Sequence, residues 1–146
     1  MEIRKKILLL ALILTLIITG CSLNFIKKRL VPPHSVGGGI LFQYDAPSAR
    51  EVNLAGNFSD NEWLKYGNKV DVMHDDGKNG DRVADDGIWS IVKQLSAGRY
   101  EYKFVVDRNS WVNDPNAIET TDDGYGGANS VLIVKYSPNL IIVRAQ

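Results

Sequence analysis

Short runs of alternating apolar and polar residues, separated by turn-forming residues, restrict the fold of this chain more than any other feature. The clearest run is "RYEYKFVV", residues 99–106. Successive side chains of an extended strand point to opposite sides. One side of this run therefore carries Tyr100, Tyr102, Phe104 and Val106, and the other carries Glu101, Lys103 and Val105. We expect the aromatic side to face a hydrophobic core.

Six further runs have the length and composition of strands: "ILFQYDA", "EVNLAG", "KVDVM", "IWSIVKQL", "SVLIVKY" and "NLIIVRA". In "KVDVM", Val70 and Val72 are expected to share one face. In "IWSIVKQL", Trp89 is expected to lie in the core. None of the runs has the period of an amphipathic helix. Short strands with turn signals between them predict an all-β fold, an antiparallel β-sandwich.

The N-terminal residues are typical of a secretory signal, with basic residues at 4–6 followed by a short apolar run. The run is shorter than the about 20 residues that a membrane span needs. The following "ITGC" resembles a bacterial lipobox, which implies a lipid on Cys21. An ordinary signal peptide or an uncleaved anchor is the alternative. The expected organisation is a lipoprotein signal peptide at 1–20, a lipid-anchored linker at 21–38 and a β-sandwich at 39–146. The protein would then sit in the cell envelope, facing the periplasm or the exterior.

Charge and cysteine content exclude several classes of function. The chain has 17 basic and 17 acidic residues, and loss of residues 1–20 removes three basic residues and Glu2, which leaves a net charge of −2. This balance does not indicate a nucleic-acid partner. Cys21 is the only cysteine, so we expect no disulfide and no cysteine-containing zinc site. His74 has no clear serine partner for nucleophilic catalysis. We predict that the protein is not an enzyme.

The acidic segment "DDGKNGDRVADDGIWS" (75–90) allows two interpretations. Carboxylates on a glycine-rich loop can bind calcium, and the candidate ligands are Asp75, Asp76, Asp81 and Asp86. However, the spacing fits an EF-hand badly, because Gly77 stands where a ligand is needed. The second interpretation is a connection built on Asp-Gly turns. No cofactor other than this calcium is expected.

Three aromatic residues lie in polar, turn-rich segments: Trp63 in "GNFSDNEW", Trp111 in "DRNSW" and Tyr125 in "DDGYGGAN". The apolar face of a pyranose stacks on such rings, while its hydroxyl groups need polar partners. Lys103 and Asn129 are suitable partners. Alternatively, the rings cap the ends of the sandwich.

The segments "GNFSDNEW", "LSAGRYEYKFVVDRNSWVNDPNA" and "GGANSVLIV" resemble the family 48 carbohydrate-binding modules. These are the immunoglobulin-like, early-set sandwiches of isoamylases, branching enzymes and the β subunit of AMP-activated kinase, and the resemblance covers about residues 39–135. It implies noncatalytic binding of an α-1,4-glucan such as glycogen, starch or maltodextrin. It also implies roles by motif position. Trp63 and Trp111 would stack on glucose, Lys103 and Asn129 would bind hydroxyl groups, and Tyr125 would be an inserted loop residue.

Two features depart from the family pattern. The segment before Trp63 is two residues longer than G-x-F-x-x-W, and Gly127 replaces a residue with a hydroxyl group. Many members of the family also use the domain only as a structural module.

Two hypotheses therefore remain. The first is a lipid-anchored module that binds α-glucan, touches the membrane through its anchor and has a glycan-active enzyme as a further partner. The second is a structural or protein-interaction lipoprotein. Sugar binding requires Trp63 and Trp111 to share one exposed face.

Overall fold

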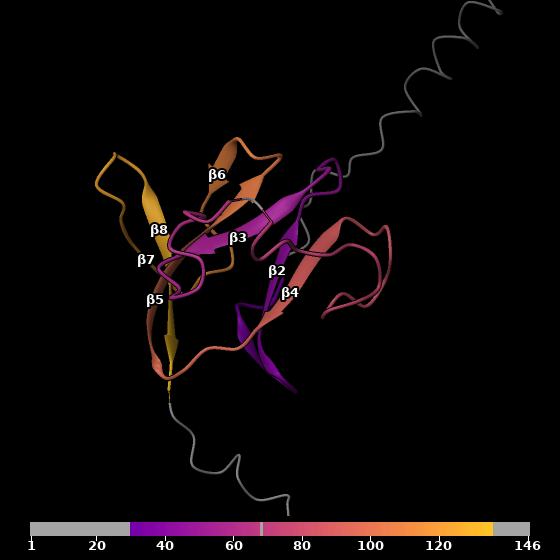
Figure 1. The fold of residues 1–146 in the computed structure, drawn as a ribbon, viewed down its shortest axis with the longest axis horizontal. Helices are drawn as coiled ribbons and strands as arrows, with labels where there is room; N and C mark the ends of the chain where they lie inside the picture. The colour runs from indigo at the N-terminus through magenta and orange to yellow at the C-terminus, as the bar shows by residue number, and fades with distance from the viewer. Residues whose placement is uncertain (1–29, 68, 136–146) are drawn as a thin grey trace, which may run out of the picture.

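The computed structural model describes residues 30–67 and 69–135 (Figure 1). Within these residues, strands form two antiparallel sheets. The smaller sheet has the order β1 (His34–Val36), β2 (Gly39–Asp45) and β4 (Ile88–Lys93). The larger sheet has the order β3 (Val52–Gly56), β5 (Gly98–Val106), β8 (Ala128–Val134) and β7 (Glu119–Asp122), and β6 (Ser110–Val112) also pairs with β5. The predicted all-β sandwich is confirmed.

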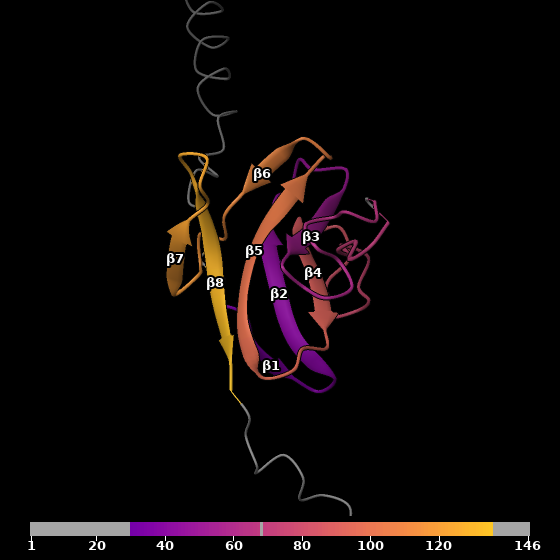
Figure 2. The same cartoon turned by 60° about the vertical axis from the view of Figure 1, so that its left-hand side comes forward.

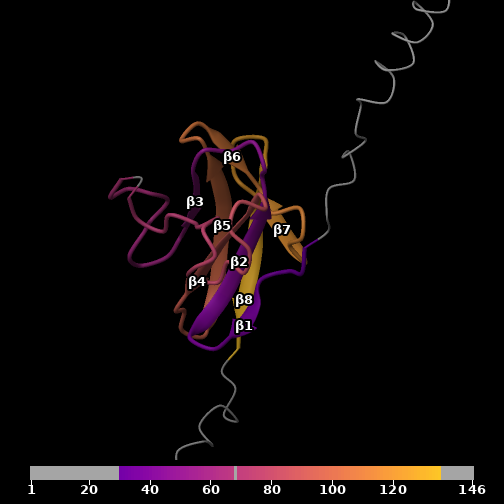
Figure 3. The same cartoon turned by 90° about the vertical axis from the view of Figure 1, so that its right-hand side faces the viewer.

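The two sheets pack face to face through aromatic side chains. Figure 3 shows β2 of the smaller sheet lying in front of β5 and β8 of the larger sheet. The ring centroids of Phe42 and Tyr102 are 5.2 Å apart, and those of Tyr44 and Phe104 are 4.8 Å apart. Tyr102 and Phe104 are fully buried, as the alternation of their strand predicts. Trp89 is partly buried and packs against this core.

The register of the larger sheet brings polar side chains together on its outer face. Trp111 of β6 lies opposite Val105 of β5, so both point away from the core together with Lys103. In β8, Val131 lies opposite Glu101, which places Asn129 on the same face two residues away. Figure 2 shows β7 at the outer edge of this sheet beside β8.

The smaller sheet begins inside the segment predicted as linker. His34–Val36 forms β1, whose register with β2 pairs Val36 with Gly39. The two residues between them, Gly37 and Gly38, therefore make a hairpin turn, and Gly38 has a φ of 107°. Glycine adopts positive φ without a steric penalty, which allows the two residues to make this tight turn.

The expectation that Val70 and Val72 share a face of a strand is wrong. The segment makes only isolated bridges, Asn53 with Val72 and His74 with Ser90, and so crosses from the edge of the larger sheet to that of the smaller one. Asp71 has a φ of 51°, which interrupts the alternation, and Met73 enters the core instead.

The acidic segment packs over the outer face of the smaller sheet. Gly80 has a φ of 100°, and a Cβ atom there would lie 2.8 Å from both Leu41 Cδ1 and Val92 Cγ2. The side chain of Leu41 is buried although it points away from the sandwich core. The glycine therefore allows the loop backbone to approach these side chains closely.

Several predictions lie outside the described residues: the signal peptide, Cys21, most of the linker and the strand "NLIIVRA". Within residues 30–67 and 69–135, there is no helix with the length and hydrophobicity of a membrane span.

Candidate functional site

A hollow on the outer face of the larger sheet brings together all the residues predicted to contact sugar. Its volume is about 590 Å³, and its lining consists of Trp63, Glu101, Lys103, Trp111, Asp123, Tyr125 and Asn129. Three regions of the chain contribute: the loop after β3, the strands β5 and β6, and the turn between β7 and β8 together with the start of β8. The site therefore depends on the fold as a whole.

The aromatic residues differ in how much of each ring is accessible. Trp111 is 45% exposed and Tyr125 is 96% exposed, whereas Trp63 is half-buried. Trp63 and Trp111 nevertheless line the same hollow, so they share one face of the molecule. This arrangement is the one that the sugar-binding hypothesis requires.

Lys103 and Asn129, the two polar side chains predicted to donate to sugar, are each paired with a carboxylate. Lys103 Nζ lies 2.6 Å from Asp123 Oδ2. Asn129 Nδ2 donates to Glu101 Oε2 at 3.0 Å. A sugar hydroxyl both donates and accepts hydrogen bonds, so adjacent donor and acceptor groups can satisfy both functions.

Glu101 and Asp123 line the hollow but were not among the residues predicted to contact sugar. The alternation of β5 could have predicted Glu101 as a site residue, because Glu101 and Lys103 are two residues apart and lie on one face of the strand. The contact of Asp123 with Lys103 joins residues 20 positions apart and has no local signal.

Asp123 also shapes the turn that carries Tyr125. Its Oδ1 accepts hydrogen bonds from Tyr125 N at 2.8 Å and Gly127 N at 2.9 Å. A Cβ atom at Gly127 would lie only 2.5 Å from Asp123 Oδ2. The glycine that departs from the family pattern therefore leaves room for the carboxylate that pairs with Lys103.

The sequence model of the glycogen recognition site of AMP-activated protein kinase matches residues 40–140. The chain belongs to this family. A carbohydrate-binding module of this kind is noncatalytic, which confirms the prediction that the chain is not an enzyme. None of the curated proteins matches the sequence.

The two carboxylates that line the hollow of this glycogen-recognition domain, Asp123 and Glu101, are ionised at neutral pH. The hydrogen bond from Lys103, together with the backbone N–H groups of Tyr125 and Gly127, lowers the pKa of Asp123 to about 2. Hydrogen bonds from Arg99 and then Asn129 lower the pKa of Glu101. The hollow therefore presents charged acceptors beside its donors.

The pKa of Asp123 predicts a contribution to stability that disappears in acid. Its ordinary value is 3.8 and its folded value is about 2, so the stabilisation is present above pH 3.8 and is lost as the pH falls towards 2. In urea unfolding, we expect the difference in stability between the wild type and Asp123→Asn to shrink over this range.

Asp122→Asn is the matched control, because the Asp122 carboxylate accepts a hydrogen bond from Gly124 N and does not pair with Lys103. A difference between wild type and Asp123→Asn that stays constant from pH 6 to pH 2 would contradict the prediction.

Trp63 lies in an unusual turn within the segment that is longer than the family pattern. Glu62, Trp63 and Leu64 have φ values of 41°, 60° and 62°. Left-handed conformations of residues other than glycine cost about 1–3 kcal/mol each and persist only where the surroundings impose them. The turn places Trp63 in the hollow in spite of the extra residues.

The acidic loop gathers part of the predicted calcium ligand set. Asp75, Asp81 and Asp86 each offer a carboxylate oxygen within 4.8 Å of the others. These carboxylates also support turns, because Gly77 N donates to Asp81 Oδ2 at 2.6 Å, and Asp86 N and Gly87 N donate to Asp75. Asp76 lies outside the group and instead faces His74, with Nδ1 3.6 Å from Oδ1. The loop has the predicted Asp-Gly turns, and calcium binding stays a prediction.

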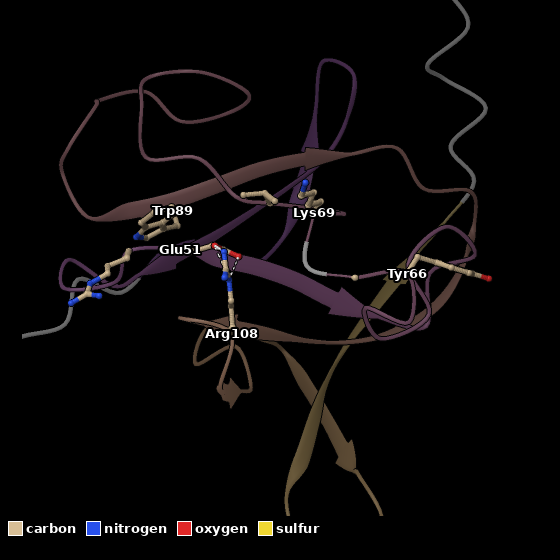
Figure 4. Close-up of a pocket in the computed structure, with 8 residues that line it drawn as sticks. Glu51, Tyr66, Lys69, Trp89 and Arg108 are labelled. Atoms are coloured by element: carbon tan, nitrogen blue, oxygen red, sulfur yellow. Dashed lines mark hydrogen bonds and ion pairs between the residues drawn. The ribbon is translucent and has the colours of Figure 1, made fainter.

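A second hollow, of about 760 Å³, contains none of the predicted sugar-contacting residues. Figure 4 shows the Arg108 guanidinium pointing at the Glu51 carboxylate near the Trp89 ring, with Tyr66 further along the hollow. The Arg108 Nη2–Glu51 Oε2 distance is 2.8 Å. This ion pair joins the residue before β3 to the loop after β5.

Proposed function

We propose that the protein is a noncatalytic module that binds α-1,4-glucan through the hollow on the larger sheet. The observation that carries the proposal is the placement of Trp63 and Trp111 around the paired donors and acceptors of the sheet. Membership of the glycogen-recognition family supports the same ligand class.

In this proposal, the two indole rings stack on the apolar faces of glucose units, and the exposed Tyr125 contacts the chain from the turn between β7 and β8. Lys103 and Asn129 donate to sugar hydroxyl groups, and the carboxylates of Asp123 and Glu101 accept from them. The hollow is open to solvent, since its residues Tyr125 and Trp111 are exposed, and this suits a polysaccharide better than a small, enclosed ligand.

We further propose that a lipid on Cys21 attaches the domain to a membrane of the cell envelope, where it faces the periplasm or the exterior. The lipobox-like "ITGC" supports this assignment. Each acyl methylene buried in the bilayer contributes about 0.8 kcal/mol, so several chains give stable anchoring. A domain anchored in this way would hold α-glucan at the surface for a glycan-active enzyme.

Retention on immobilised polysaccharide tests the proposed function. We expect the wild-type protein to be retained on amylose and glycogen resins but not on cellulose, which has β-linkages. A single shallow site should have a Kd on the order of micromolar to millimolar. If the wild type is retained on no α-glucan, the proposed function is wrong, and the structural or protein-interaction role is favoured.

A further inference from the structure

A lysine ammonium in the interior of the sandwich contacts the loop that carries Trp63. Lys93 is the last residue of β4, and its side chain is only 5% exposed. Its Nζ lies 2.7 Å from Asp60 Oδ2 and 2.8 Å from Asp71 Oδ2. It also lies 5.1 Å from the centroid of the Phe58 ring. The ion pairs of Lys93 therefore connect the smaller sheet to the loop that follows β3 of the larger sheet.

A buried asparagine connects this ion pair to the turn. Asn61 is fully buried, and its Nδ2 donates to Asp71 Oδ2 at 2.6 Å and to Leu54 O at 2.8 Å. Its Oδ1 accepts a hydrogen bond from Leu64 N at 2.7 Å. Asn61 thus links the carboxylate held by Lys93 directly to the last residue of the left-handed turn.

The left-handed turn needs such support. None of its residues is a glycine, and three consecutive residues with positive φ are not maintained by local sequence preference. The N–H of Trp63 donates to Gly56 O at 2.7 Å, which fixes the backbone of Trp63 against the end of β3. Together with the hydrogen bond from Leu64 N to Asn61, this bond holds the middle and the last residue of the turn.

We propose that Lys93, Asp71 and Asn61 are positioning residues that hold Trp63 in the glucan-binding hollow. The proposal rests on the proposed function, since it names what places one of the two stacking rings. Without the Lys93–Asp71 ion pair and the Asn61 hydrogen bonds, the turn relaxes to right-handed or extended backbone and the Trp63 ring leaves the hollow. Trp111 and the Lys103–Asp123 pair stay in place, because they belong to β5, β6 and the turn between β7 and β8.

The position of Trp63 can be followed without sugar. The chain has three tryptophans, so the full chain labelled with 5-fluorotryptophan gives three ¹⁹F resonances, and Trp63→Phe identifies the one from Trp63. We expect Lys93→Met to move the Trp63 resonance towards that of free tryptophan and to raise its H₂O/D₂O isotope shift. The Trp111 resonance should keep its isotope shift.

Matched variants separate positioning from general destabilisation. Lys78→Met removes a lysine whose side chain is 75% exposed and should leave all three resonances unchanged. Asp60→Asn removes one charge from a 63% exposed carboxylate and should shift the Trp63 resonance in the same direction by less. This variant tests the proposal even if Lys93→Met does not fold. Glu62→Asn should partly restore the resonance in the Lys93→Met protein, because asparagine adopts the left-handed conformation more readily.

Binding of maltoheptaose completes the test. Loss of one of two stacking rings should weaken the affinity about three- to tenfold in Lys93→Met, with Lys78→Met equal to wild type. An unchanged Trp63 resonance in both Lys93→Met and Asp60→Asn would overturn the proposal, as would a shifted resonance with full affinity. If the wild type binds no α-glucan, the proposed function fails, while the resonances still decide whether this network places Trp63.

Discussion

Replacement of Trp111 by alanine is expected to abolish retention of the protein on amylose and to leave its fold intact. The ring is 45% exposed and lines the hollow, so it is available for stacking on glucose. Trp111 lies in a three-residue strand, is not part of the hydrophobic core, and is paired across the sheet with Val105 of β5. Cross-strand pairs contribute about 0.2–1 kcal/mol, so the stability should fall only slightly.

Affinity electrophoresis in gels that contain amylose or glycogen, with thermal unfolding in parallel, measures both effects. Ile133→Ala is the matched control, because Ile133 is an exposed apolar residue on the same face of the larger sheet but does not line the hollow. It should be retarded like the wild type. Trp111→Tyr keeps an aromatic ring and should be partly retarded. Full retardation of Trp111→Ala would contradict the assignment of the site.

Phe42→Ala is expected to produce the largest loss of stability, about 3–5 kcal/mol. Phe42 is fully buried on β2, and its ring packs edge-on against Tyr102 of the other sheet and Phe58 of the loop after β3. Truncation would leave a cavity where three parts of the core meet. For a domain of this size, the unfolding temperature should fall by roughly 4–8 °C for each kcal/mol.

Chemical denaturation of matched variants tests this prediction. Phe42→Leu keeps most of the buried volume and should cost much less than Phe42→Ala. Tyr66→Ala removes an aromatic residue that is 61% exposed, and its effect should stay within about 0.5 kcal/mol. A loss below about 1 kcal/mol for Phe42→Ala would show that this ring does not hold the two sheets together.

The strands could be predicted where one face of a sheet is buried. The alternation in β5 correctly placed Tyr102 and Phe104 in the core and Lys103 on the opposite face. It failed for residues 70–72, because the positive φ of Asp71 interrupts the pattern, and Asp71 is bonded instead to Leu54 N of the larger sheet and to Lys93 of the smaller sheet. The sequence predicts a linker where the two-glycine turn before β2 lies, because a glycine run is compatible with a flexible linker and with a tight turn.

The aromatic and donor residues of the candidate site could be predicted from the sequence. The carboxylates that pair with the lysines around them could not. The polar, turn-rich segments indicated Trp63 and Trp111, with Asn129 as a polar partner, and the resemblance to a family implied the role of each; the structure brings all three together. The pairing of Lys103 with Asp123 and of Lys93 with Asp71 joins distant segments. Such contacts follow from tertiary structure and leave no spacing signal in the sequence.

The hollow is assembled from the loop after β3, the strands β5 and β6, and the turn between β7 and β8 with the start of β8, and this has a thermodynamic consequence. No single segment of an unfolded chain contains the complete constellation, so a glucan that occupies the hollow binds the folded state alone. Occupancy then shifts the folding equilibrium by RT ln(1 + [L]/Kd), or about 2.7 kcal/mol at a ligand concentration of 100 Kd. The polysaccharide would act as a stabiliser of the very domain that binds it, most strongly where glucan is abundant.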